Sequence, residues 1–216
     1  MNPKLNEEKQ KFQVDRIAFF SDAVFAIAIT LMIIEVKPPH LETEANNAAA
    51  IEGLLHVLPM FIGVVISFVF IGIFWFRHHQ LFKHIVNYDN KLIGYNLFLL
   101  LSIIFIPFST AFNFENSLQH TIVPLLFYNV NYIVSTLATY LLFKYALNPA
   151  NGLCSADAEE DHTHLFRELM FSLVVFTMVV VLSFFVPRYA PLGYIAFGLQ
   201  GIFYKNKKAV QVTSDN

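Results

Sequence analysis

The chain has 216 residues, of which 56% are hydrophobic and only 14% carry a charged side chain, and its net charge is −2. Soluble domains carry about 25% charged residues, so a membrane protein explains this composition better than a soluble fold. The small negative charge excludes the basic surface that nucleic-acid binding requires. The single cysteine, Cys154, excludes an intrachain disulfide and a multi-thiolate metal centre.

Six stretches are predicted to cross the bilayer as helices, because about 20 mostly apolar residues match its hydrocarbon thickness. They cover residues 12–36, 53–76, 92–114, 118–143, 169–187 and 189–204. Pro59, Pro107 and Pro124 lie inside these stretches and predict kinks. Residues 148–164 are rich in polar and acidic side chains and are expected to form the longest soluble loop. The predicted fold class is therefore all-α, a polytopic membrane protein whose single domain covers residues 1–216.

Basic residues are distributed unevenly between the two sides of these spans. Twelve of the 14 Lys and Arg residues lie near the start of the first span or follow the second, fourth and sixth, whereas Lys37 and Arg188 lie on the other side. The positive-inside rule therefore predicts cytoplasmic termini and an even number of spans. We expect a multi-pass protein of the cell (inner) membrane. The first apolar stretch has 25 residues and contains Asp22, so it is expected to be a retained helix rather than a cleaved signal.

Asp22 is the only acidic residue well inside a predicted span. Ionisable groups inside a membrane are costly and usually face a partner within the bundle. Arg16 is not a partner along one helix face, since six residues place it about 120° away. Candidate partners on other helices are His78, His79 and Asn96. Two readings stay open at this point: a structural clamp between helices, or a direct ion or proton site.

Ile27, Leu31 and Ile34 follow one another at i, i+4 and i+7 and form an apolar stripe along the first span, with Thr30 on its flank. Such a stripe is typical of ordinary helix packing. It is also suited to a pore lining, because large apolar side chains close a pore by dewetting. Glu35 follows directly and is either a solvated acid or part of an acidic ring at a pore mouth.

Trp75, His78 and His79 end the second span. An interfacial tryptophan with solvated histidines explains them, and two adjacent histidines provide too few ligands for zinc. The sequence contains none of the motifs GxSxG, HExxH, GxxxxGK[ST] or GxGxxG. We therefore predict no enzymatic activity, no structural metal and no cofactor.

Arg16, Phe20, Ser21 and Asp22 spell RxxxFSD inside the first span. This motif resembles the signature of the transmembrane protein 175 family, the potassium channels of lysosomes and of many bacteria. The resemblance continues through the adjoining AVFAIAITLMIIEV, the WxxHH stretch that starts at Trp75, and residues 96–97 and 107–108. It covers about the first half of the chain and implies a bacterial member with one six-span unit, which assembles as a homotetramer.

The resemblance implies that the first helices of the four subunits line the pore in place of a TVGYG filter loop. Ile27 would then form the apolar constriction that acts as gate and filter, with Leu31 and Ile34 as the next layers. Thr30 would occupy a hydroxyl-bearing position linked to potassium preference. Potassium, and other monovalent cations, would occupy this pore inside membrane lipid.

The resemblance also implies that Arg16, Ser21 and Asp22 are structural. They would be tied to His78, Trp75 and Asn96 in a network that fixes the pore helix, which favours the clamp reading of Asp22. The sequence thus predicts a potassium-permeable cation channel. The alternatives are a secondary transporter or proton-coupled carrier that uses Asp22, and a membrane sensor whose acidic loop docks a soluble partner.

Overall fold

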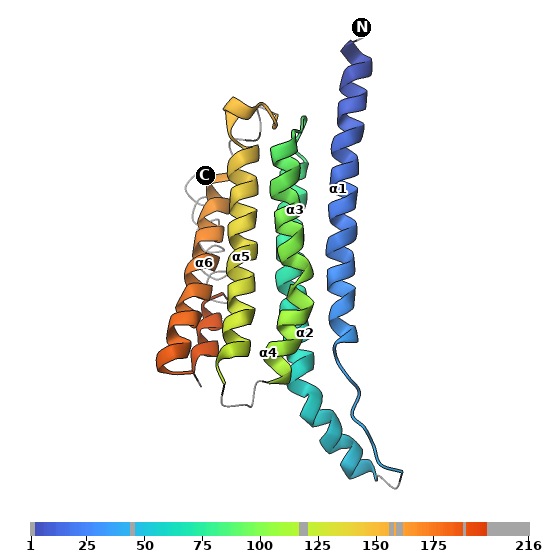
Figure 1. Ribbon diagram of the computed structural model, residues 1–216, viewed down its shortest axis with the longest axis vertical. Coiled ribbons are helices and arrows are strands. Elements are labelled where there is room, and N and C mark those ends of the chain that lie inside the picture. Colours follow the sequence, from blue (N-terminus) through green and yellow to red (C-terminus); the bar gives the residue numbers. More distant parts are fainter. Residues whose placement is uncertain are drawn as a thin grey trace, which may run out of the picture.

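The computed structural model describes residues 3–43, 46–116, 121–155, 158, 162–187 and 189–197, almost entirely as helices. The long helices are α1 (Pro3–Ile34), α2 (Asn47–Phe82), α3 (Asn90–Ile104), α4 (Ile106–Glu115), α5 (Val123–Ala146) and α6 (His162–Phe185). Two short 3-10 helices, η1 (Pro149–Asn151) and η3 (Ala190–Tyr194), follow α5 and α6. Figure 1 shows a bundle with α1 at one edge and α6 at the other, so α1 has a side that no other helix covers.

Five helical segments are long and apolar enough to cross a membrane: Glu8–Ile34, Asn47–Phe82, Asn90–Glu115, Val123–Ala146 and Leu165–Phe185. They correspond to the first five predicted spans and confirm the all-α polytopic fold class. Of the sixth predicted span, residues 198–204 lie outside the described residues, and the described part begins as the short helix η3. In the predicted soluble loop, the described residues include η1 and Cys154, which forms an antiparallel bridge with Ile85. The last three residues of that predicted loop, 162–164, are instead the start of α6.

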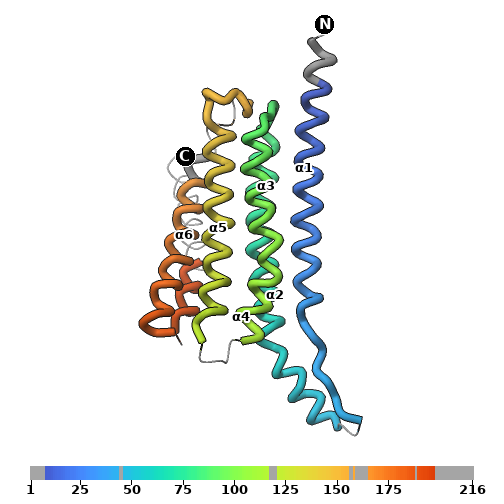
Figure 2. The backbone as a smooth tube through the Cα atoms, viewed as in Figure 1, coloured from blue at the N-terminus to red at the C-terminus, as the bar shows by residue number. Residues whose placement is uncertain are grey.

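The three prolines act differently. Pro59 lies inside α2, and Figure 2 shows the first turns of that helix tilting away from the bundle. Pro107 lies in the first turn of α4, directly after the break at Phe105 that separates α4 from α3. Pro124 lies in the first turn of α5, where the missing N–H costs nothing, so the kink predicted there is wrong.

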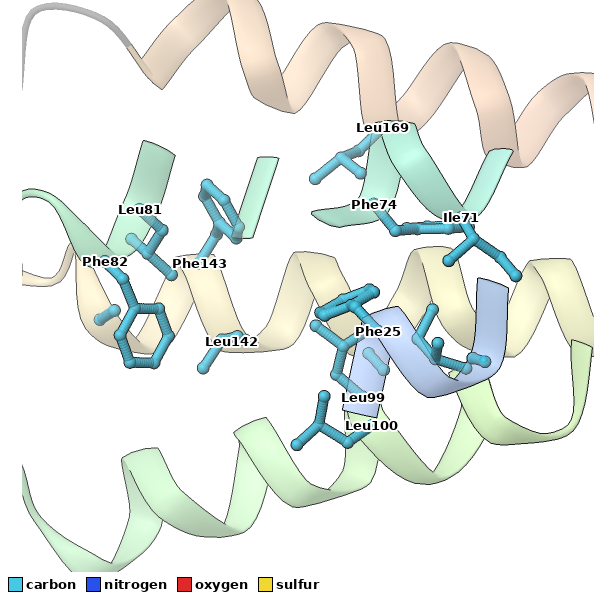
Figure 3. Close-up of a cluster of buried hydrophobic side chains, with 14 of the residues drawn as sticks. Phe25, Ile71, Phe74, Leu81, Phe82, Leu99, Leu100, Leu142, Phe143 and Leu169 are labelled. Carbon is cyan, nitrogen blue, oxygen red and sulfur yellow. The ribbon is translucent and has the colours of Figure 1, made fainter. Parts of the chain in front are cut away.

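The helices are held together by a buried cluster of large apolar side chains. Figure 3 shows Phe25 of α1 among residues of α2, α3 and α5, with Leu169 of α6 nearby. Lipid tails are as apolar as these side chains, so close van der Waals packing rather than burial from water stabilises such a cluster. Gly63 permits one of the closest approaches, since a Cβ there would lie 2.3 Å from the Phe114 ring.

One end of the bundle is tied by hydrogen bonds between loops. The Val86 amide donates to the Leu153 carbonyl over 2.8 Å. Asp89 caps α3 by accepting from the Leu92 amide over 2.7 Å, and it also accepts from the Tyr145 hydroxyl of α5. These two donors, the tyrosine first, lower the pKa of the Asp89 carboxyl below its ordinary value. The first turns of α1 reach the same end of the bundle (Figure 1).

Candidate functional site

One face of α1 packs inside the bundle. Its buried residues recur at spacings of seven, four, three and four, and they are Val14, Ser21, Phe25, Ala28 and Met32. That spacing keeps them on one side of a helix, and α1 packs with this side against α2, α3 and α4. The position of α1 in the bundle is therefore determined by the face that contains Ser21.

Another face of α1, roughly 120° around the helix from the buried one, contains the stripe that the sequence singles out. Ile27, Leu31 and Ile34 are 56%, 42% and 70% exposed, although all three are large and apolar. Thr30 is also exposed, and its hydroxyl donates to the Ile27 carbonyl over 3.0 Å. Glu35 is exposed one residue beyond the end of α1. The stripe is therefore not part of the core of a single subunit.

A chain of buried hydrogen bonds fixes the buried face of α1. Ser21 donates from Oγ to the Ile17 carbonyl over 2.9 Å, so its oxygen is free to accept from Nδ2 of Asn96, also at 2.9 Å. The amide oxygen of Asn96 then faces Nε2 of His78 at 2.9 Å. An amide oxygen only accepts, so Nε2 of His78 must carry the hydrogen. This chain joins α1 to α3 and α2.

Asp22, the residue after Ser21, has a different partner. Its carboxylate accepts a hydrogen bond from Nε1 of Trp75 on α2 over 2.9 Å. Trp75 in turn stacks on His79, with ring centroids 5.6 Å apart. The hydrogen-bond donor to Asp22 is therefore Trp75, which is not one of the three partners proposed from the position of Asp22 in its span. Asn96, one of those three, donates to Ser21 instead.

The histidines of the WxxHH stretch have unlike surroundings. His78 is buried, stacks on Phe82 with centroids 4.2 Å apart, and lies 5.5 Å from Phe25 of α1. His79 is exposed. Within the described part of the chain, no group of three His, Cys, Asp or Glu side chains comes close enough to hold a metal ion.

Two residues of the RxxxFSD motif lie apart from these hydrogen bonds. Arg16 is exposed, and its guanidinium donates to Oε1 of Gln13 over 3.4 Å. Phe20 is 54% exposed. The motif thus divides in the structure: Ser21 and Asp22 contact α3 and α2, whereas Arg16 and Phe20 point away from the bundle core.

Sequence reasoning missed a second polar cluster, between α2, α4 and α5. The Thr110 hydroxyl lies 2.8 Å from Oγ of Ser67, which lies 3.1 Å from the Tyr128 hydroxyl. Nearby, Asn131 donates to Ser109 over 3.1 Å. Small hydroxyl residues often hydrogen-bond between membrane helices. The Ser and Thr residues inside spans without charged residues were the sequence signal that could have indicated this cluster.

A family model described as "Endosomal/lysosomal potassium channel TMEM175" matches residues 16–107, which include all of the network from Ser21 to Asn96. A potassium channel from Chryseobacterium sp. (strain P1-3) is 30% identical over 183 residues, which cover 85% of this chain and 86% of that relative.

The chain belongs to the TMEM175 family.

Other TMEM175 comparisons agree on the fold and on the first half of the chain. The crystal structure of a lysosomal potassium-selective channel TMEM175 homolog from Chamaesiphon minutus superposes with a TM-score of 0.73 at 24% identity, over 90% of this chain and 97% of that one. The human endosomal/lysosomal proton channel TMEM175 is 34% identical over 76 residues, which cover 33% of this chain and 15% of the human protein. Relatives in this family are thus named for potassium and for protons.

Proposed function

We propose that this protein is a potassium-permeable cation channel. Four copies would assemble around one axis in the cell membrane, with cytoplasmic termini, and line the pore with α1. The observation that carries the proposal is the exposed stripe of Ile27, Leu31 and Ile34, on a different face of α1 from its anchoring network. One stripe does not surround an ion path, so a closed symmetric ring of subunits is required.

The chemistry of the stripe fits a gate that excludes water. A dehydrated cation gains nothing from Ile or Leu side chains, so a narrow apolar ring resists conduction until it widens or rehydrates. Ile27 is the proposed constriction, and Leu31 and Ile34 form the next layers. Thr30 offers the oxygen that a cation needs nearby, because its hydrogen is used on the Ile27 carbonyl and its lone pairs stay free.

The anchoring network gives the proposed pore helix a fixed rotation. Ser21 bonds to Asn96 on α3 and Asp22 bonds to Trp75 on α2, so two neighbouring helices hold α1 from different directions. With this face held, the stripe is presented to the assembly axis. Glu35, at the far end, would raise the local cation concentration at that mouth.

The carrier alternative depends on Asp22 as a titrating, substrate-coupled group. It predicts saturable, coupled flux that Asp22→Asn abolishes while folding and assembly stay normal. The channel proposal predicts that Asp22→Asn acts on expression and assembly, because its carboxylate holds α1 against Trp75. Measuring flux and oligomer mass on the same preparation distinguishes the two.

The proposal is tested with purified protein in lipid vesicles, by recording potassium, sodium and proton flux together with oligomer mass. We expect tetramers that pass potassium faster than sodium, and Ile27→Asn is expected to raise the flux because a polar side chain hydrates the constriction. Ile33→Asn is the matched control, since Ile33 is 54% exposed and lies about 120° around the same helix. Flux that is unchanged in Ile27→Asn, or raised equally in both variants, would refute the gate.

A further inference from the structure

The exposed face of α1 continues beyond the apolar stripe toward the N-terminus. Arg16 precedes Ile27 by eleven residues, which is about three helical turns, so the two side chains leave α1 on the same side. The helix is continuous from Pro3 to Ile34, so no break disturbs this relationship. Arg16 and Ile27 are both exposed in the single subunit. A pore lined by the stripe would therefore also receive the Arg16 side chain.

The charge of Arg16 has no acidic partner on this face. Its recorded hydrogen bond goes to the neutral side chain of Gln13, and neither ion pair among the described residues includes it. The acids of α1 whose side chains are described lie seven residues apart, at Glu8, Asp15 and Asp22. Seven residues return to one side of a helix, and this side lies about 80° to 120° from Arg16.

The position of Arg16 along α1 places it at a pore mouth. Counted back from Ile34, the roughly 20 residues that match the bilayer core end near residue 15. Arg16 therefore lies at the N-terminal edge of the span, and Glu35 lies at the other end. The α1 macrodipole has the same sign pattern, positive at the N-terminus and negative at the C-terminus.

We propose that the Arg16 side chains of the four subunits form a positive ring at the N-terminal mouth of the pore, which makes cation conduction asymmetric. This inference rests on the proposed tetrameric channel. The ring lowers the cation concentration at its own mouth, so cations enter more readily from the Glu35 end. Arg16 thus has a role separate from that of Ser21 and Asp22, which hold the helix.

Salt sets the size of the asymmetry, because mobile ions screen the ring. The Debye length is about 30 Å at 0.01 M and about 3 Å at 1 M. We expect the currents at equal positive and negative voltage to differ by on the order of threefold at low salt, a modest value for focused charge at a pore mouth. At 1 M salt the two currents should become nearly equal.

The test is single-channel recording of the full-length protein in planar bilayers with equal potassium on both sides. The ratio of the currents at opposite voltages is measured from about 0.02 to 1 M salt, a range that spans strong to weak screening. Arg16→Gln should bring the low-salt ratio close to one, whereas Arg16→Lys should keep it. Lys11→Gln is the matched control, because Lys11 is exposed and lies about 140° around the helix from Arg16.

Two results would overturn the inference. One is a low-salt ratio that Arg16→Gln leaves unchanged or that Lys11→Gln alters equally. The other is a wild-type ratio that does not depend on salt, which decides the matter even where Arg16→Gln does not assemble. The effect of Ile27→Asn separates the channel proposal from the Arg16 ring. If that variant raises flux and Arg16→Gln leaves the asymmetry unchanged, the channel proposal is supported and the ring is refuted.

Discussion

The two faces of α1 are occupied in opposite ways, although they belong to one continuous helix from Pro3 to Ile34. The inner face is small and polar at Ser21, and it is fixed there by a hydrogen bond from Asn96. The outer face is large and apolar at Ile27 and Ile34, and in a single subunit more than half of each side chain is exposed.

One side of α1 is thus fixed inside the subunit while the other side stays open to contact other copies. Hydrogen bonds are directional, so two of them to different helices fix the rotation of α1 as well as its position. The outer face then needs no partner inside the subunit and can meet the same face of other copies. On this account, damage to the inner face costs stability, whereas damage to the outer face changes conduction.

The largest effect on stability is expected for Asn96→Leu. The change keeps the side-chain size but removes both bonds of the amide, leaving the buried Nε2–H of His78 without its acceptor. A buried donor without a partner costs about 1–3 kcal/mol, which is expected to lower Tm by several degrees. Thermal unfolding in detergent, followed by the fluorescence of Trp75, measures this. Asn90→Leu, at an exposed position of the same helix, should leave Tm nearly unchanged, and equal losses would contradict the assignment.

A smaller effect is expected for Asp22→Ala, because its bond to Trp75 is partly exposed. Loss of the acceptor is expected to cost about 1 kcal/mol, less than for a buried charged bond. Trp75 is the only tryptophan of the chain, so its emission reports the loss directly. Asp22→Asn keeps an acceptor oxygen but loses the charge that strengthens the bond, so its spectrum should lie between those of Asp22→Ala and the wild type. Identical spectra for Asp22→Ala and wild type would argue against this bond.

The smallest effect concerns the cap of α3, the helix that contains Asn96. The folded-state pKa of Asp89 is lowered, so its contribution is present above the unfolded-state pKa and is lost as the pH falls through the lower folded value. Stability should therefore be flat near neutral pH and should decline below about pH 4, where unperturbed aspartates titrate. Asp89→Asn keeps a capping oxygen and should remove this part of the acid dependence. An unchanged acid profile in Asp89→Asn would exclude Asp89 as its source.

Much of the fold could be predicted from the sequence because its signal is local. Apolar runs of about 20 residues identified the five spans, and the spacing of Ile27, Leu31 and Ile34 identified a face that the structure leaves uncovered. The predicted kink at Pro124 was wrong because α5 begins only at Val123, which places Pro124 in its first turn. The loop before α5 determines that start.

The partners of the polar residues could not be derived from spacing. Ser21 and Asp22 are adjacent in sequence, but successive residues point about 100° apart on a helix, toward α3 and α2 respectively. Which helix lies in each direction is a property of the packed bundle. The partly buried ion pair between Arg77 of α2 and Glu168 of α6, at 3.3 Å, was missed for the same reason.

The most direct test of the account asks whether the outer face of α1 lines the ion path. Cys154 is the only cysteine, so Cys154→Ser gives a cysteine-free background. Burial raises the pKa of the Cys154 thiol to about 11, so this thiol is mostly protonated near neutral pH. In that background, single-channel potassium currents of Ile27→Cys and Ile33→Cys are recorded while silver ions, which bind thiolates, are added. We expect rapid, lasting block of Ile27→Cys and no block of Ile33→Cys. Block of Ile33→Cys alone, or of neither variant, would contradict it.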